Sequence, residues 1–375
     1  IYTGQIDYQL PINDTGSFET GLKYSKVDTE SNILQKNIIN DAEIIDISNT
    51  DMFNYDEQVY AAYINLSKEW GKFSFNAGLR AEQTNVEGRS LSLAEANVQD
   101  YLEWFPSSSI GYDLTDRASL YASYKRSITR PNFRNLNPFR FFLNDNTIVT
   151  GNPGLQPVFT DHLILGTSLG SHIFEVYYLK RKNNITELPI QDNNTNIISY
   201  TPINFDSTDE LGFDYTVSFN PLKDWSVFLV TSFYYTKDQI GWVNGQNVEQ
   251  DIWANYTQLS NNLSLLKDKS LTVDVTFYYV SKNLQGLQRV DPLLFSEVMV
   301  KKTAFKGKGV FSLGIEDLFN EQDFLVKTRF LDQNNSNFSD LDNRLISLGF
   351  RYTFGNTKLA STEQALDKEE RERLD

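Results

Sequence analysis

The chain has 375 residues, with 34 Lys and Arg against 49 Asp and Glu, which gives a net charge of −15. Aromatic residues make up 14% of it, although the mean hydropathy is only −0.41. The aromatic content argues against a disordered chain, and an acidic chain repels nucleic-acid phosphates. The sequence contains no cysteine for disulfides or thiol chemistry. It also has no run of about 18 apolar residues, which argues against membrane-spanning helices.

The main pattern along the chain is a strict alternation of apolar and polar residues, which indicates β-strands. Successive side chains of a strand point to opposite faces, so each such segment has one apolar and one hydrophilic face. The clearest segments are 2–10, 73–80, 211–219, 271–279 and 346–354. We predict fifteen strands, in chain order at 1–11, 17–28, 53–67, 72–85, 100–113, 117–129, 158–169, 172–183, 209–220, 225–236, 251–265, 270–281, 293–304, 309–318 and 343–355.

The connections between these strands alternate between short and long. A soluble β-sandwich gives no reason for this alternation, whereas outer-membrane barrels have short periplasmic turns and longer extracellular loops. The sequence therefore predicts an all-β fold, an antiparallel transmembrane β-barrel. The long connections, expected on the outside of the cell, lie at 29–52, 86–99, 130–157, 184–208, 237–250, 282–291 and 319–343.

The number and direction of the strands imply more of the barrel before Ile1. The chain opens within a strand, without an initiating Met or an apolar leader, so we expect it to be part of a longer chain. The last strand follows a long connection and runs inward, and the first of fifteen strands runs the same way. Because bacterial single-chain barrels have an even strand number, an odd number should precede Ile1. Seven more would give about 22, the size of plugged transporters.

The apolar face of a membrane barrel points to lipid, and aromatic residues gather at its two interfaces. Trp70 and Trp225 lie beside short turns, which makes them candidates for a membrane interface. The alternative at this point is a turn-side tryptophan in a soluble protein. The predicted lipid-facing residues are Phe73, Phe75, Leu79, Phe213, Tyr215, Val217, Val273, Val275, Phe277, Leu348, Phe350 and Tyr352.

The connection 130–157 contains four prolines that limit its backbone pairing. Pro131, Pro138, Pro153 and Pro157 remove backbone donors, so this segment cannot continue a sheet without interruption. We expect a rigid, self-packed extracellular loop, with ligand contact as the alternative. Three phenylalanines are placed either to line a binding surface or to cover the barrel mouth: Phe139, Phe141 and Phe142.

We find no constellation that indicates catalysis, a cofactor or a metal ion. His162 follows Asp161, but no nucleophile of clear context accompanies them, so a pore or rim role is the simpler interpretation. The segments 192–196 and 332–336 begin like calcium loops but lack the Gly and Glu that such loops need further on. The chain is therefore not expected to be an enzyme.

The last strand carries Gly349, Tyr352 and Phe354 in the order Gly-x-x-aromatic-x-aromatic. This order resembles the assembly signal read by the outer-membrane insertion machinery, and strand addition to an open edge is a general recognition mode. Ordinary lipid-facing alternation explains the same aromatics. After the barrel portion, 1–355, residues 356–375 switch to a charged run, for which we expect a solvated periplasmic tail.

Several motifs, taken in order, resemble one family. They are Ala77-Gly78-Leu79-Arg80-Ala81-Glu82-Gln83-Thr84, Trp104-Phe105-Pro106-Ser107, Arg130-Pro131, Leu136-Asn137-Pro138-Phe139, Gly151-Asn152-Pro153-Gly154-Leu155-Gln156-Pro157 and Asp317-Leu318-Phe319-Asn320. Over residues 1–355, the chain resembles the C-terminal barrel portion of the TonB-dependent receptor-like outer-membrane β-barrel family of Bacteroidota. The sequence does not include the plug domain and TonB box of that family.

The resemblance implies a barrel in the bacterial cell outer membrane that takes up a bulky nutrient, energised from the inner membrane through TonB. The alternative is a non-transporting structural or scaffold barrel subunit of a multiprotein outer-membrane complex. Expected partners are outer-membrane lipid, the insertion machinery, TonB, and a surface lipoprotein or other subunits of such a complex. The sequence names neither the ligand nor the residues that bind it.

Overall fold

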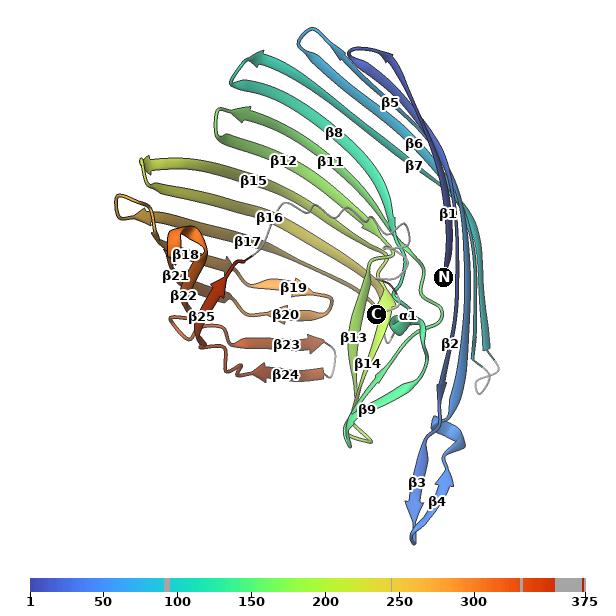
Figure 1. The fold of residues 1–375 in the computed structure, drawn as a ribbon. Coiled ribbons are helices and arrows are strands. Elements are labelled where there is room, and N and C mark those ends of the chain that lie inside the picture. The colour runs from blue at the N-terminus through green and yellow to red at the C-terminus, as the bar shows by residue number, and fades with distance from the viewer. Residues whose placement is uncertain (91–94, 244, 331–332, 355–372, 374–375) are drawn as a thin grey trace.

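The computed structural model describes residues 1–90, 95–243, 245–330, 333–354 and Arg373. Its main feature is one sheet of fifteen strands, paired antiparallel, which curves around a central space (Figure 1). The strands follow one another in chain order. They are β1 (Tyr2–Asn13), β2 (Gly16–Ile33), β5 (Asp51–Trp70), β6 (Phe73–Ser90), β7 (Glu95–Thr115), β8 (Ala118–Thr129), β11 (Val158–Leu169), β12 (His172–Lys182), β15 (Ser207–Leu222), β16 (Trp225–Val243), β17 (Gln246–Leu265), β18 (Leu271–Val280), β21 (Leu293–Ala304), β22 (Gly309–Glu316) and β25 (Ile346–Tyr352).

The long connections carry shorter elements, which form three small sheets. One sheet has the order β13-β14-β10-β9, the second β19-β20-β23-β24, and the third is the hairpin β3-β4. Their bounds are β3 (Lys36–Ile39), β4 (Ala42–Ile45), β9 (Arg140–Asn144), β10 (Thr147–Thr150), β13 (Ile185–Asp192), β14 (Ile197–Asn204), β19 (Asn283–Gln285), β20 (Gln288–Val290), β23 (Phe324–Phe330) and β24 (Gln333–Ser339). The helical turns are η1 (Ile47–Asn49), α1 (Phe133–Leu136) and η2 (Phe305–Gly307).

The fifteen predicted strands correspond one to one to the strands of the main sheet, which confirms the fold class. The predicted ends next to the long connections were wrong, because several strands continue well beyond them. The connection expected at 237–250 is a tight turn between β16 and β17, and those expected at 29–52 and 86–99 are shorter in the same way. Beyond the apolar segment the outward face carries polar pairs such as Lys237 opposite Asp251, so backbone pairing outlasts the hydrophobic alternation.

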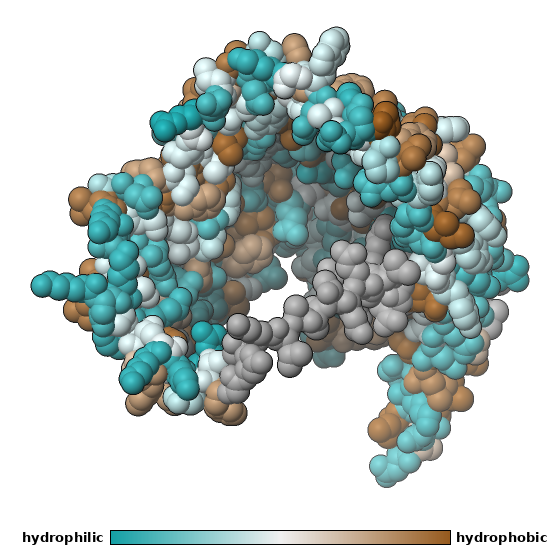
Figure 2. All heavy atoms as spheres, turned by 45° about the horizontal axis from the view of Figure 1, so that its top comes forward, coloured by the Kyte–Doolittle hydropathy of each residue, from teal (hydrophilic) through white to brown (hydrophobic). Residues whose placement is uncertain are grey.

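The two faces of the sheet differ in burial. On β5, Phe53 and Glu57 point to the inner face and are buried, whereas Tyr60 and Ile64 point outward and are exposed. Figure 2 shows hydrophobic side chains on the outside of the curved wall. The strand register places the predicted lipid-facing residues on this outer face. Val217 is only 3% exposed, because it lies between its cross-strand neighbours His172 and Leu229.

The main sheet ends at β1 on one side and at β25 on the other, and the described residues show no pairing between these two strands. Both run from the long-connection end toward the short-turn end, so they could not pair with each other in the antiparallel sense. The seven further strands expected before Ile1 stay a prediction.

Among the described residues, no helix is long and apolar enough to cross a membrane.

Candidate functional site

The two tryptophans predicted at an interface both lie at the short-turn end of the sheet. Trp70 closes β5 and is 81% exposed. Trp225 opens β16, and its Nε1 donates a hydrogen bond to Asn261 Oδ1 at 3.2 Å. These positions suit side chains that place an apolar ring in lipid and a polar tip in the interface. Their role as membrane-interface aromatics stays a prediction.

The three residues of the expected assembly signal lie on or just after β25, an edge strand of the described sheet. Gly349 and Tyr352 belong to the strand, and Phe354 follows it with 83% of its surface exposed. The neighbouring ring of Phe350 packs on Phe311 of β22, with 4.7 Å between ring centroids. The aromatics therefore stabilise the last strand pair, and the signal itself stays a prediction.

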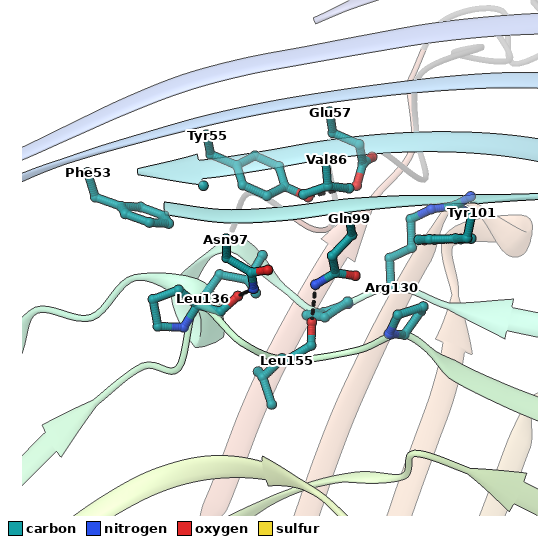
Figure 3. A pocket seen from close by; sticks show the side chains of 14 residues that line it. Phe53, Tyr55, Glu57, Val86, Asn97, Gln99, Tyr101, Arg130, Leu136 and Leu155 are labelled. Atoms are coloured by element: carbon teal, nitrogen blue, oxygen red, sulfur yellow. Dashed lines mark hydrogen bonds between the residues drawn. The ribbon is translucent and has the colours of Figure 1, made fainter. Parts of the chain in front are cut away.

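The connection after β8 does not extend away from the wall but packs on the inner face of β5, β6 and β7 (Figure 3). Its apolar residues Leu136, Phe139 and Leu155 form a buried cluster with Phe53 and Tyr55 of β5. Phe53 and Leu155 have 0% of their surface exposed. The prediction that this connection is rigid and packed is consistent with this cluster, although part of the packing is against the wall rather than within the loop.

Two amides of β7 fix the backbone of the same connection. Gln99 Nε2 donates a hydrogen bond to Leu155 O at 2.8 Å, and Asn97 Nδ2 donates to Pro153 O (Figure 3). Carbonyl groups in a proline-rich segment have few backbone partners, and a buried carbonyl without a donor is costly. The wall therefore supplies the donors that the connection lacks.

Charged groups on the inner face also hold this connection. We call the apolar cluster, the two amides and these charged groups together the anchoring patch. Arg130 Nη2 donates to Glu82 Oε2 at 2.6 Å and to Thr84 Oγ1 at 2.9 Å. Glu82 Oε1 also accepts from Arg80 Nε at 2.5 Å. The cavity beside Arg130 has a volume of about 20 Å³, which leaves room for about one water molecule and for no nutrient. This patch is therefore an anchor for the connection and not a ligand site.

Glu57 extends the anchoring patch onto the neighbouring strand β5. Its Oε2 accepts hydrogen bonds from Tyr55 OH at 2.7 Å and from Arg373 Nη2 at 2.6 Å. The backbone N–H of Phe133 donates to Arg373 O at 2.9 Å. Arg373 belongs to the segment predicted as a periplasmic tail, and the rest of that segment lies outside the described residues.

A larger hollow lies on the inner face of β12, β15 and β16, below the hairpin β13–β14. Its volume is about 550 Å³, within the range of ligand-binding sites. We call it the luminal hollow. Its polar lining residues are Arg181, Asn184, Thr186, Glu187, Thr208, Glu210, Tyr234, Thr236, Asp238, Asn283 and Gln285.

The polar groups of the luminal hollow are held by hydrogen bonds along the wall. Glu210 Oε1 accepts from Tyr177 OH at 2.8 Å, and Glu210 Oε2 lies 3.7 Å from Arg181 Nη1. Asp238 is 6% exposed, and its Oδ1 accepts from Thr208 Oγ1 at 2.6 Å. In the hairpin above, burial raises the pKa of Glu187. The hollow thus offers both fixed acceptors and fixed donors to a solute.

An apolar cluster at the long-connection end of the sheet, which we call the rim, holds the connections around the luminal hollow. It joins the hairpin β13–β14 to the ends of β16 and β17 and to the β19–β20 turn. Its buried residues are Leu188, Phe205, Ile240, Val243, Val248 and Leu287. The hairpin is therefore packed against the wall beside the hollow.

The two histidines lie in different surroundings, and neither forms a catalytic arrangement with the described residues. The ring of His162 packs edge-on against Tyr177, with 5.8 Å between centroids, and Asp161 accepts from Tyr124 OH. His172 Nδ1 lies 2.8 Å from Tyr215 OH. The described residues include no group of three or more side chains that could hold a metal ion.

The segment that begins like a calcium loop at Asp192 forms a turn. Asp192 Oδ1 accepts from the backbone N–H of Asn194 at 2.9 Å, and Asp192 Oδ2 accepts from Thr195 Oγ1 at 2.9 Å. Hydrogen bonds from the backbone hold the pKa of Asp192 below its usual value. Asp and Asn side chains commonly shape turns in this way, which accounts for the residue pattern without an ion.

The sequence did not single out Glu57, Glu82, Glu210 or Asp238 as functional residues. One signal was present: each occupies an inward position of a strand whose alternate residues are apolar and face outward. Which inward residues meet across the central space depends on strand register and on the path of the connections. These are long-range properties that alternation does not specify.

The curved antiparallel sheet, its apolar outer face and its polar luminal hollow define an outer-membrane β-barrel protein. Residues 1–352 match the model of the outer membrane protein beta-barrel family, and the chain belongs to this family. It is accordingly a protein of the bacterial outer membrane. A comparison with curated proteins finds no match.

Solved structures with a similar fold are outer-membrane receptors and transporters. The copper transporter OprC superposes with a TM-score of 0.68 at 12% identity, covering 94% of this chain and 56% of that one. The ferric-catecholate import receptor Fiu from K12 E. coli superposes with a TM-score of 0.63 at 12% identity, covering 94% of this chain and 54% of that one. The siderophore receptor PiuA from Acinetobacter baumannii superposes with a TM-score of 0.62 at 16% identity, covering 93% of this chain and 55% of that one. The chain thus spans about half the length of these proteins, and the likeness is one of fold.

Proposed function

We propose that the chain is the C-terminal part, residues 1–355, of a TonB-dependent-receptor-like barrel that takes up a bulky nutrient. A charged tail, residues 356–375, follows the last strand at the periplasmic end, and its Arg373 contacts Glu57 on the inner face. The observation that carries the proposal is the luminal hollow of about 550 Å³, which lies on the inner wall and is framed by inward-packed connections. A barrel that serves only as a scaffold needs no such framed, polar site on its inner face. The fold shared with import receptors supports the same proposal.

The distribution of polar groups also supports uptake. A second hollow of about 450 Å³ lies on the inner wall nearer the short turns and is lined by residues such as Asn262, Asp274, Glu297 and Lys301. Polar sites at both ends of the inner wall give a solute hydrogen-bond partners along the barrel. Binding at several weak sites favours passage over retention.

The proposed class comes with further expectations from the family resemblance. We expect the protein to come from Bacteroidota, not to be an enzyme, and to receive energy from the inner membrane through TonB. Gly349, Tyr352 and Phe354 are read by the insertion machinery, and Trp70 and Trp225 lie in the membrane interface. A surface lipoprotein is the proposed partner at the mouth.

The experiment that tests uptake uses the full-length gene in its own host. Deletion strains are grown on an array of large nutrients as the only carbon, nitrogen or metal source, beside a strain that lacks TonB. We expect a growth defect on one nutrient class, shared by both strains. Complementation with the double variant Glu210→Gln, Asp238→Asn should restore growth only in part, whereas Glu249→Gln, at a rim pair with Lys237, should restore it fully.

The alternative function, a scaffold subunit of an outer-membrane complex, is a defined outcome of the same experiment. In that case deletion leaves growth on every nutrient unchanged, and other outer-membrane proteins lose abundance or no longer co-purify. That pattern, with the abundance of those proteins fully restored by the luminal double variant, would contradict uptake.

A further inference from the structure

The outer face carries an apolar groove that uptake does not use. It has a volume of about 700 Å³ and crosses β1, β2, β5, β6 and β7. Its base lies where Ala62 of β5 and Ala81 of β6 face each other as register partners. Four larger side chains stand around these alanines, namely Leu22, Tyr24, Tyr60 and Leu102. We call this feature the outer groove.

The groove arises from side-chain size along one row of the sheet. Leu22 is the register partner of Ala62, and Ala81 is the partner of Trp104. Two methyl groups therefore lie between two large side chains, and Leu22 and Trp104 remain 61% and 52% exposed. No described side chain fills the space between them, so the sheet leaves an apolar gap on its outer face.

The position of the outer groove relative to the membrane follows from the strand. Trp70 and Tyr60 both point outward on β5 and are ten residues apart. A membrane-spanning strand has about 9–11 residues, and aromatic residues mark both ends of the apolar band. The groove at Tyr60 therefore lies at the upper boundary of the hydrocarbon, in the leaflet next to the long connections.

The groove is apolar at its base and polar at the end nearer the long connections. There Tyr60 OH donates to Gln58 Oε1 at 3.2 Å, and Gln83 Nε2 donates to Asp100 Oδ1. Lys26 and Asp56 follow on the same outward face, with 2.9 Å between Nζ and Oδ2. An occupant thus meets methyl and aromatic surface first and then amide, hydroxyl and charged groups, which is the order of groups in a membrane lipid.

We propose that the outer groove is a binding site for one membrane lipid. An acyl chain lies over Ala62 and Ala81, between Leu22 and Leu102, and the polar head lies beside Tyr60 and Gln83. Because this face is immersed in the bilayer, the apolar matter that reaches it is acyl chain. The rings of Tyr24 and Tyr60 pack together, with 4.9 Å between their centroids, and form a fixed side of the groove. Such a fixed side suits one bound acyl chain rather than the mobile acyl chains of the bulk bilayer.

The test is native mass spectrometry of the full-length protein, purified from outer membranes in a mild detergent. We expect a retained lipid adduct of one stoichiometry on the unaltered protein. The double variant Ala62→Leu, Ala81→Leu fills the groove with apolar atoms and should reduce that adduct several-fold. The matched control Ala77→Leu, Ala122→Leu adds the same atoms at outward positions outside the groove and should retain it.

Folding of each variant is checked by heat-modifiable gel mobility, so that a misfolded protein is not scored as one without lipid. Equal adducts on the groove and control variants would overturn the proposal, as would an unaltered protein without retained lipid. A co-purifying protein that is lost with the groove variant alone would show a protein partner and would also overturn it. None of these outcomes bears on nutrient uptake, because the groove and the luminal hollow lie on opposite faces.

Discussion

Arg130 Nη2 lies 2.6 Å from Glu82 Oε2, and the two side chains are 6% and 7% exposed. Arg130 stands at the start of the connection after β8, and Glu82 lies on the inner face of β6. The pair therefore joins a connection to a strand 48 residues earlier in the chain. Removal of one partner from a buried ion pair leaves the other charge without compensation.

We expect Glu82→Gln to destabilise the anchored connection by about 3–5 kcal/mol, which is the cost of removing one partner from a buried ion pair. The measurement is the rate of proteolysis within residues 130–157 in the purified, folded protein. Glu87→Gln is the matched control, because Glu87 pairs with Arg89 at an exposed site on the same strand. An equal effect of the two variants would show that the buried pair does not hold the connection.

Leu155→Ala should loosen the same connection through its apolar contacts. Leu155 is fully buried against Phe53, and truncation of a buried leucine costs about 2–5 kcal/mol. Hydrogen exchange of the amides in 130–157 should become faster. Leu143→Ala in β9, where the side chain is 67% exposed, should leave the exchange rates unchanged. Unchanged exchange in both variants would mean that the proline-rich backbone is rigid without the wall.

Val275→Arg should impair insertion, since Val275 lies on the outer face of β18. Its register partners are Asn261 and Val298, and an arginine on the lipid face near the midplane costs about 2–4 kcal/mol. Thr276→Arg is the control, because Thr276 lines a hollow on the inner face. Folding yield in lipid vesicles, read from heat-modifiable mobility, should fall for the first variant and not for the second.

The long connections should be exposed on the cell exterior and the short turns in the periplasm. The sequence contains no cysteine, so single cysteines report on position without further changes. Asn193→Cys, in the β13–β14 turn, should react with a membrane-impermeant maleimide on intact cells. Lys223→Cys, in the β15–β16 turn, should react only after the outer membrane is permeabilised. The reverse result would invert the topology.

Asp291 should make the packing of the β19–β20 turn dependent on pH. Its carboxylate accepts a hydrogen bond from Lys327 Nζ at 2.5 Å and lies 3.6 Å from Lys282 Nζ, and the Lys327 bond holds its pKa below the ordinary 3.8. Because the folded-state pKa is lower than the unfolded one, the contribution is present above pH 3.8 and is lost as the pH falls through the lower value.

Cleavage of residues 281–330 by an acid protease should therefore increase as the pH falls below about 3.8, beyond the change in the activity of the protease on an unfolded substrate. Asp291→Asn should show fast cleavage at every pH and no pH-dependent part. A variant with the same pH profile as the unaltered protein would show that the pair does not hold the turn.

The parts of the strands that cross the hydrocarbon could be predicted from the sequence, because lipid on one face requires an apolar side chain at every second residue. Phe73, Phe75 and Leu79 display this period without interruption, and each lies outward in β6. Beyond the hydrocarbon this requirement for alternating apolar residues no longer applies. At Gln239 and Glu249 both faces meet water or other connections, so the strand continues while its hydropathy pattern ends.

The candidate site could not be predicted in the same way. Glu210 and Asp238 were visible as inward charges, but their part in one hollow depends on how β15 pairs with β16 and on the hairpin that lies above. The same limit applies to Arg130, whose partner Glu82 is 48 residues away. Alternation specifies which face a residue occupies, and it carries no information on the residues opposite.

The length of β16 and β17 has a consequence for how a solute meets the protein. Each has 19 or 20 residues, whereas crossing the hydrocarbon takes about 9–11. About half of each strand therefore stands above the lipid as a protein rim, and the apolar cluster of Leu188, Phe205 and Ile240 braces that rim from within. The upper edge of the sheet is thus raised above the headgroup layer, so a large molecule that approaches from the surrounding medium would meet the protein rim before the membrane.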